Sequence, residues 1–333
     1  MPVRVGVIGT GNIGSAHVRR LAGQIAGTTV SAVFDVAAER ARTVADAVGA
    51  RAHHQATDVI DDPAVDAVLI ASPADTHAEL ALACLAAGKP VLCEKPLAST
   101  AAAALKVLRA EAALGRRVIQ VGFMRRYDKG YVAMKAAIDG GSIGVPLLAH
   151  CVHRNASVPP GFTTEMAMTD SVVHEIDVVR WLLGQEFVSA RALTGLASPL
   201  APTGVRDPQL AVLETSSGVL VEVESFVNCQ YGYDVRCEIV GSTGTVSLVD
   251  PTATTMHSAR QRTQEIAPDW GTRFEAAYIA ELQQWADGVA GGIVCGPSAW
   301  DGYAAAAVAE SCVTALSSDD PVQVALVDRP ALY

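Results

Sequence analysis

The chain lacks an excess of basic side chains: 25 lysines and arginines face 35 aspartates and glutamates among 333 residues, so the net charge is −10. A nucleic acid or an anionic membrane surface requires a basic face on its partner, so neither is expected. Uninterrupted apolar runs are also short of the roughly 18 residues that a membrane-spanning helix needs. The N-terminus shows no basic region followed by a hydrophobic core, which argues against a signal peptide. We therefore expect a cytoplasmic protein without a membrane partner.

Cysteines are few and scattered. The seven cysteines are odd in number and show no CxxC spacing. A disulfide framework or a structural zinc site would need regularly spaced pairs. We expect reduced cysteines in the core and no bound metal.

Short apolar strands alternate with helical segments as far as residue 122. The expected strands are Val3–Ile8, Val30–Phe34, Ala67–Ala71, Val91–Cys93 and Val118–Val121. The expected helices between them are Asn12–Ala26, Ala38–Val48, Thr76–Ala87 and Thr100–Leu114. Strands with few polar residues, separated by helices, are typical of a parallel sheet covered on both faces. Residues 1–122 are therefore predicted to form a doubly wound α/β domain.

The pattern changes after residue 123. Longer strands are expected at Pro146–Arg154, Leu210–Thr215, Val219–Phe226, Val235–Val240 and Thr245–Val249. Several are joined by short turns, and alternation of valine with glutamate in 219–227 favours an antiparallel sheet with one covered face. Helices are expected at Thr169–Leu183, Phe274–Val289 and Ala299–Leu316. Residues 123–333 are thus predicted to form an α+β domain with a large, mainly antiparallel open sheet.

A glycine pattern follows the first strand. Gly9-Thr-Gly11-Asn-Ile-Gly14 is a GxGxxG motif between a strand and a helix. In that context the glycines allow a tight turn and let a pyrophosphate approach the helix N-terminus, as in a Rossmann dinucleotide-binding domain. Asp35 closes the second strand, where a carboxylate accepts hydrogen bonds from the adenosine ribose and repels a 2′-phosphate. This favours NAD over NADP, although Arg40 lies close by in the sequence.

Further polar residues follow the carboxyl ends of later strands, where open α/β sheets bind ligands. Ser72-Pro73 ends the third strand, and His77 begins the next helix. As a lone histidine, His77 is better explained by a structural hydrogen bond at the helix end than by a catalytic role. The residues expected to bind the cofactor are Gly9, Gly11, Asn12, Ile13, Gly14, Asp35, Ser72, Pro73, His77, Glu94 and Lys95.

Three polar residues suggest the chemistry. Asp170 and His174 lie four apart in a segment expected to be helical, so their side chains should be neighbours on one face. A carboxylate beside an imidazole can hold the ring in one tautomer and stabilise its protonated form, which suits a general base. An ammonium such as that of Lys95 could stabilise an alkoxide. Behind a dinucleotide motif, this trio indicates alcohol oxidation by hydride transfer. Taken alone, the Asp170/His174 pair is better explained as an ion pair on a helix surface.

These motifs together resemble a known family. Glu94-Lys95-Pro96 after a Rossmann half, followed by Asp170-x-x-x-His174-x-x-Asp177, is similar to the Gfo/Idh/MocA family of sugar and polyol dehydrogenases. The resemblance spans essentially the whole chain. Within the family, stretches such as 122–128, 150–155, 228–234 and 298–303 resemble the members that act on inositol.

The resemblance implies specific roles. His174 would take the hydroxyl proton as hydride leaves the same carbon, Asp170 would orient His174, and Lys95 would stabilise the substrate oxygen. It implies NAD as cofactor, myo-inositol as substrate, 2-keto-myo-inositol (scyllo-inosose) as product, and a homotetramer. Polyol hydroxyls both donate and accept hydrogen bonds, so several polar side chains are needed. The expected substrate-binding residues are Lys95, Arg125, His153, Asn155, Asp170, His174 and Tyr233.

Two alternatives remain open from the sequence. The substrate could be another inositol isomer or a pyranose sugar, since epimers differ only in the direction of one hydroxyl. The chain could also be a non-catalytic sensor that binds nucleotide and regulates a partner. A sensor has no need of a base or of the lysine, so the presence of Lys95, Asp170 and His174 disfavours it.

Overall fold

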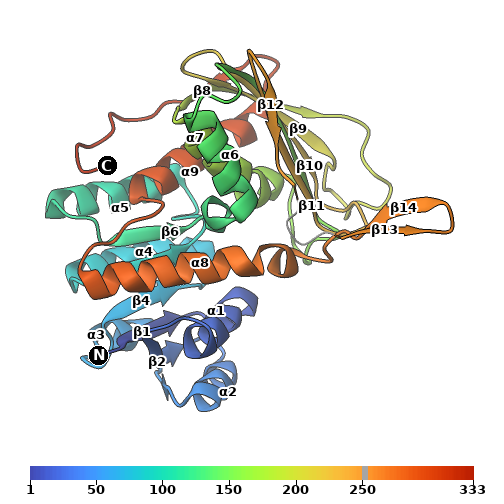
Figure 1. Cartoon of the computed structure of the whole chain (residues 1–333). Helices are drawn as coiled ribbons and strands as arrows, with labels where there is room; N and C mark the ends of the chain where they lie inside the picture. The colour runs from blue at the N-terminus through green and yellow to red at the C-terminus, as the bar shows by residue number, and fades with distance from the viewer. Residues whose placement is uncertain (250–253) are drawn as a thin grey trace. The chain divides into compact units, whose positions relative to one another are not determined.

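A computed structural model describes residues 1–249 and 254–333 of the chain (Figure 1). The chain forms two compact units, each built from more than one segment. The first unit comprises residues 1–123, 278–306 and 327–333, and the second comprises residues 124–277 and 307–326. Among the described residues, no helix combines the length and the apolar character needed to cross a membrane.

The first unit contains a six-stranded parallel sheet in the order β3-β2-β1-β4-β5-β6. Its strands are β1 (Val3–Ile8), β2 (Thr28–Phe34), β3 (Arg51–Ala52), β4 (Ala67–Ile70), β5 (Val91–Glu94) and β6 (Ile119–Gly122). The helices between them are α1 (Asn12–Gly23), α2 (Ala38–Val48), α3 (Ala56–Asp61), α4 (Ala74–Ala86) and α5 (Ala101–Leu114). The predicted doubly wound parallel sheet is confirmed.

The core of the first unit includes a segment from late in the chain. Val5, Val7 and Leu69 on the central strands are fully buried. Leu282 and Trp285 belong to the same apolar cluster. They lie in α8 (Trp270–Gly291), so the part of this helix after residue 277 completes the core around the sheet.

The second unit contains a seven-stranded sheet in the order β12-β11-β7-β10-β9-β8-β15. Its strands are β7 (Pro146–Arg154), β8 (Phe187–Thr194), β9 (Gln209–Thr215), β10 (Leu220–Phe226), β11 (Asp234–Gly241), β12 (Thr245–Ser247) and β15 (Val322–Gln323). Only β7 and β10 pair in parallel, and every other neighbouring pair in this sheet is antiparallel. The predicted mainly antiparallel sheet is therefore confirmed.

One face of this sheet is covered and the other is open. On β10, Val221, Val223 and Ser225 are fully buried, whereas Leu220 is 47% exposed. Two helices, α6 (Lys129–Asp139) and α7 (Val173–Leu183), lie on one side of the sheet in Figure 1. The period-two alternation of the sequence thus corresponds to one face against helices and one face towards solvent.

Other elements complete the described chain. A short 3₁₀ helix spans Met124–Tyr127, α9 spans Ala299–Ala315, and β13 (Thr255–Ser258) pairs with β14 (Gln261–Gln264) as a separate hairpin. The expected α-helix from Thr169 to Leu183 differs from the structure. Residues Ala167–Val172 form a π-helical turn, and α7 begins only at Val173.

Candidate active site

The glycine motif in the first unit forms an open turn between β1 and α1. Gly9 has a φ of +93°, and a Cβ there would lie 2.5 Å from the carbonyl oxygen of Ala71. A Cβ on Gly14 would lie 1.9 Å from the carbonyl oxygen of Gly9. A Cβ on Gly11, in contrast, would meet no atom of the described residues within 4 Å. The first and third glycines are therefore needed for the chain's own packing, while the second faces space that a bound group can approach.

The helix that follows this turn presents its N-terminus there. Asn12 and Ile13 form the first turn of α1, whose preceding residue Gly11 provides no side-chain cap. No acidic residue lies in that first turn. Free backbone N–H groups and the positive end of the helix dipole favour an anionic group such as a pyrophosphate. The turn thus fits the phosphates of a dinucleotide.

Asp35 lies just beyond the end of β2 and is held by several donors. Its Oδ2 accepts hydrogen bonds from Thr10 N (2.7 Å) and Thr10 Oγ1 (3.0 Å), and its Oδ1 accepts one from Ala37 N (2.8 Å). Arg40 donates to both oxygens, at 3.1 and 2.6 Å. Burial acts to raise the pKa of Asp35, but the Arg40 guanidinium and these hydrogen bonds hold it below its ordinary value. The carboxylate is therefore ionised and fixed in position at neutral pH.

His77 connects the ends of two strands. Its Nδ1 lies 2.7 Å from Pro96 O and its Nε2 lies 2.8 Å from Ser72 O, and its side chain is buried. Ser72 Oγ lies 2.7 Å from Thr76 Oγ1, and Pro73 precedes the first residue of α4. Both ring nitrogens of His77 thus face backbone oxygens. His77 positions the segments after β4 and β5, which carry Ser72 and Lys95.

Lys95 follows β5 and is anchored by a buried pair. The Nε2 of His17 lies 2.7 Å from Glu94 Oε1, and Lys95 N donates to Glu94 Oε2 at 3.1 Å. Burial acts to raise the pKa of Glu94, but His17 and Lys95 hold it below its ordinary value. The Lys95–Pro96 peptide bond is cis. Glu94 thus links the first helix to the backbone of Lys95.

In the second unit, four of the expected substrate-binding residues meet in one buried cluster. Arg125 Nη2 lies 3.1 Å from His153 Nδ1 and donates to Tyr233 Oη at 3.4 Å. The rings of His153 and Tyr233 meet edge to face, with centroids 5.8 Å apart. The His174 ring stacks on that of His153 at 6.2 Å, with an angle of 23° between the planes. The structure thus brings Arg125, His153, Tyr233 and His174 together.

Asp170 and Asn155 differ from the residues of the cluster in burial, because neither of them is buried. Asp170 belongs to the π-helical turn and is exposed, whereas His174 is buried in the first turn of α7. The prediction of a single α-helix carrying both was wrong, because a π turn intervenes; such turns occur often at functional sites. Asn155 is half-buried beyond β7, where its N–H donates to Phe226 O (3.1 Å) and its carbonyl accepts from Cys229 N (2.9 Å).

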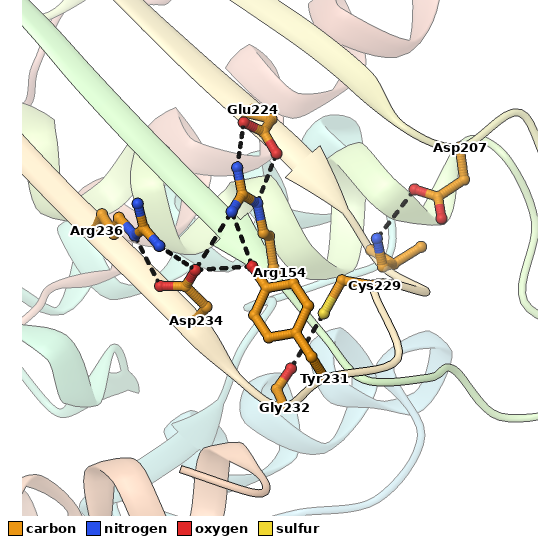
Figure 2. A network of polar contacts seen from close by, with 9 residues as sticks. Arg154, Asp207, Glu224, Cys229, Tyr231, Gly232, Asp234 and Arg236 are labelled. Carbon is orange, nitrogen blue, oxygen red and sulfur yellow. Dashed lines mark hydrogen bonds and ion pairs between the residues drawn. The ribbon is translucent and has the colours of Figure 1, made fainter. Parts of the chain in front are cut away.

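Figure 2 shows a second polar network, on the other face of β7. Successive side chains of a strand point to opposite faces, so Arg154 faces away from His153. Arg154 donates to both carboxylate oxygens of Glu224, at 2.7 and 2.8 Å, and to Tyr231 Oη at 2.8 Å. Tyr231 in turn donates to Asp234 at 2.8 Å. Tyr231 therefore belongs to the open face of the sheet, whereas Tyr233 belongs to the buried cluster.

Sequence reasoning missed two buried partners, Glu175 and His17. Glu175 contacts both Arg125 and His153. It stands in Val-Val-His-Glu-Ile, where the surrounding apolar residues predict burial on all sides. A carboxylate buried in such a helix requires a cationic partner. The apolar residues around Glu175 could therefore have predicted its buried ion pair. His17 carried no comparable signal, because its partner Glu94 is 77 residues away in sequence.

Comparison with known proteins assigns the chain to a family. The family description "Oxidoreductase family, NAD-binding Rossmann fold" matches residues 3–123, and "Oxidoreductase family, C-terminal alpha/beta domain" matches residues 135–324. The chain belongs to the Gfo/Idh/MocA family of oxidoreductases. The resemblance found in the sequence is thereby confirmed, and so is NAD as the cofactor of its first domain.

Named relatives cover the whole chain. It is 53% identical to inositol 2-dehydrogenase 1 of Saccharopolyspora erythraea, over 100% of this chain and 99% of that protein. It is 48% identical to inositol 2-dehydrogenase of Burkholderia ambifaria, over the same shares. Among solved structures, myo-inositol dehydrogenase of Lactobacillus casei in complex with NAD(H) and myo-inositol matches with a TM-score of 0.96 and 37% identity, covering all of both chains.

Proposed function

We propose that this chain oxidises myo-inositol to 2-keto-myo-inositol (scyllo-inosose) with NAD. The observation that carries the proposal is the similarity, over the full length of both chains, to a dehydrogenase structure that contains NAD(H) and myo-inositol. Two relatives that share about half of their residues with this chain are named inositol 2-dehydrogenase, which supports the same reaction. Bound NAD supplies the hydride acceptor, which no side chain can provide.

Three residues are proposed to carry the proton and charge movements. His174 takes the proton of the reacting hydroxyl, a step for which a positioned imidazole is suited at neutral pH. Asp170 orients His174 and stabilises its protonated form. Lys95 holds the substrate oxygen and stabilises the negative charge that develops there. The buried, stacked ring of His174 supports its part in this assignment, because a base must be held in place.

Cofactor binding is proposed to use the turn after β1 and the ends of the following strands. Gly9 and Gly14 allow the tight turn, Gly11 leaves space for the pyrophosphate, and the N–H groups of Asn12 and Ile13 face it. Asp35 accepts hydrogen bonds from the adenosine ribose. Ser72, Pro73 and Lys95 follow strands whose carboxyl ends lie along one edge of the sheet. His77 and Glu94 position that edge through the contacts described above.

Substrate recognition is proposed to use the buried cluster of the second unit together with the half-buried Asn155 beyond β7. Arg125 supplies donors, and His153, Asn155 and Tyr233 supply groups that donate or accept. A polyol hydroxyl that finds both kinds of partner binds without leaving a buried polar group unsatisfied. The contacts among Arg125, His153 and Tyr233 support a single preformed binding surface.

A panel assay separates this function from the alternatives. Purified protein is mixed with NAD or NADP and with myo-inositol, its epimers or glucose, and NADH or NADPH formation is followed by absorbance. We expect the highest kcat/KM with NAD and myo-inositol. A higher value with an epimer or with glucose would keep the mechanism and replace the substrate. NAD binding without turnover on any polyol would favour a nucleotide sensor.

We further propose a cytoplasmic homotetramer that acts in inositol catabolism. The open face of the seven-stranded sheet supports an assembly contact, because Leu193 (51% exposed) and Leu220 (47%) lie on the same face as the Arg154–Glu224 pair. Exposed apolar side chains grouped on a sheet face commonly mark an interface. Light scattering during gel filtration should give four times the mass of the 34.6 kDa chain. A monomeric mass would contradict the proposal.

A further inference from the structure

Glu175 is a buried carboxylate that none of the proposed catalytic steps uses. Its side chain is 1% exposed and forms an ion pair with Arg125, which is equally buried. Its Oε2 lies 2.9 Å from His153 Nδ1, and its Oε1 lies 3.1 Å from the same nitrogen. Glu175 therefore contacts two of the residues proposed to bind the polyol.

The charges of this cluster keep Glu175 ionised. Burial acts to raise the pKa of Glu175, but Arg125 and His153 hold it below its ordinary value. Burial acts to lower the pKa of Arg125, but Glu175 holds it well above its ordinary value. At neutral pH the carboxylate is thus an acceptor only, and the guanidinium is a donor only.

The ionised Glu175 determines which ring nitrogen of His153 carries a proton. Two carboxylate oxygens face Nδ1, so the stable arrangement places a proton on Nδ1 that is donated to Glu175. Arg125 Nη2 is farther from Nδ1 (3.1 Å) than Glu175 Oε2 is (2.9 Å), and it also donates to Tyr233. A neutral imidazole has one N–H, so Nε2 of His153 is then an acceptor. The ring itself is held between His174 and Tyr233.

We propose that Glu175 is a positioning residue that holds His153 in its Nδ1–H tautomer, so that Nε2 accepts a hydrogen bond from a polyol hydroxyl. The inference rests on the proposed function, in which Arg125 and His153 bind that polyol. Arg125 offers only donors, while a hydroxyl must both accept and donate. Arg125 lies on the Nδ1 side of the ring. In the Nδ1–H tautomer, Nε2 therefore supplies an acceptor on the other side of the ring, for the proton of a hydroxyl that meets it there. The opposite tautomer would leave the hydroxyl proton without an acceptor.

The tautomer can be measured directly, without any activity assay. Solid-state ¹⁵N NMR of protein labelled at histidine distinguishes protonated from unprotonated ring nitrogens, and the spectrum of His153→Gln identifies the His153 signals. We expect a protonated Nδ1 and an unprotonated Nε2 in the unaltered protein. In Glu175→Gln the amide N–H₂ faces Nδ1, so we expect the proton to move to Nε2. An Nε2–H tautomer in the unaltered protein, or an unchanged tautomer in Glu175→Gln, would overturn the proposal.

The effect on binding is tested with the same variant. We expect Glu175→Gln to raise the KM for myo-inositol by roughly tenfold, as for an unsatisfied buried hydrogen bond, with a much smaller change in kcat. The matched control is Glu186→Gln, whose carboxylate also bonds an arginine through two oxygens (Arg180, 2.6 and 2.7 Å) near the far end of α7. An unchanged KM in Glu175→Gln, or an equal rise in Glu186→Gln, would overturn the role in binding.

The two readouts separate failure of this proposal from failure of the proposed function. If the unaltered protein does not oxidise any polyol, the proposed function fails, and the NMR spectra still decide the tautomer. If Glu175→Gln does not fold, the spectrum of the unaltered protein still decides it. An observed Nε2–H tautomer together with normal turnover would overturn the positioning role alone.

Discussion

At the scale of single residues, His174 is held by its surroundings rather than exposed on a helix surface. The residue is 7% exposed and its ring stacks on His153. We expect His174→Ala to lose at least about 10² in kcat, as for removal of a general base, while NAD binds as before. Steady-state kinetics and NAD titration measure the two effects. His257→Ala, which alters an exposed histidine of β13, serves as the control.

Near-normal turnover in His174→Ala would remove this residue from the mechanism. Loss of NAD binding in the same variant would indicate a structural role in place of a catalytic one.

The Asp35–Arg40 pair defines the expected cofactor preference. The Asp35 carboxylate repels a 2′-phosphate and also accepts hydrogen bonds from the guanidinium of Arg40. Replacing Asp35 with serine removes the repulsion and frees an arginine that can pair with a phosphate. We expect Asp35→Ser to increase kcat/KM for NADP relative to NAD. In the double variant Asp35→Ser/Arg40→Ala most of this gain should disappear.

If NADP remains excluded in Asp35→Ser at high concentration, the discrimination lies in other residues. If the double variant uses NADP as well as the single one, Arg40 does not contact the phosphate.

At the scale of secondary structure, the sequence predicted those elements whose pattern is strong. The bounds of β1, α2 and β7 agree with prediction at both ends. A glycine with positive φ follows both β1 and α2, and such a residue ends a regular element. The helix α6 was missed, since Gly130 in its first turn weakens the helical pattern. The strand β8 was missed because alanines and a serine give little contrast between its faces. The π turn before α7 could not be predicted, because no residue type specifies it.

The start of α6 has a clear stabilising contact. Asp128 caps it by accepting hydrogen bonds from Gly130 N (3.0 Å) and Tyr131 N (3.2 Å), and it pairs with the buried Arg273 at 2.8 Å. We expect Asp128→Ala to lower the free energy of unfolding by about 2–4 kcal/mol, because the helix cap and the buried ion pair with Arg273 are both lost. Urea unfolding measures this. Asp139→Ala, at the exposed end of α6, should cost less than about 1 kcal/mol.

Equal losses in Asp128→Ala and Asp139→Ala would show that the Asp128 contacts do not stabilise the fold.

At the scale of the whole molecule, the fold class followed from the sequence but the composition of the compact units did not. Alternation of strands and helices indicated a parallel sheet, and period-two patterns indicated the antiparallel sheet. Residues 278–306 and 327–333 belong to the first unit, although they come late in the chain. Trp285, for example, belongs to the same apolar cluster as Val5 and Val7. Such pairing of distant segments depends on tertiary packing, and one sequence contains no local signal for it.

The acid stability of the molecule follows from its buried carboxylates. Asp35, Glu94 and Glu175 all have a lowered pKa in the folded state. Their stabilising contribution is complete above the unfolded-state pKa of about 4 and is lost as the pH falls through the folded-state values. We expect the free energy of unfolding to fall steeply below about pH 4, and less steeply in Asp35→Asn. A stability that does not change between neutral pH and about pH 3 would contradict this.

If the proposed reaction is right, hydride leaves carbon 2 of myo-inositol for NAD. We would test this with myo-inositol that carries deuterium at this carbon, using mass spectrometry of both products. We expect reduced cofactor that contains the deuterium, formed together with unlabelled 2-keto-myo-inositol. Unlabelled NADH, with deuterium retained in the ketone, would show that another carbon is oxidised and that the proposed reaction is wrong.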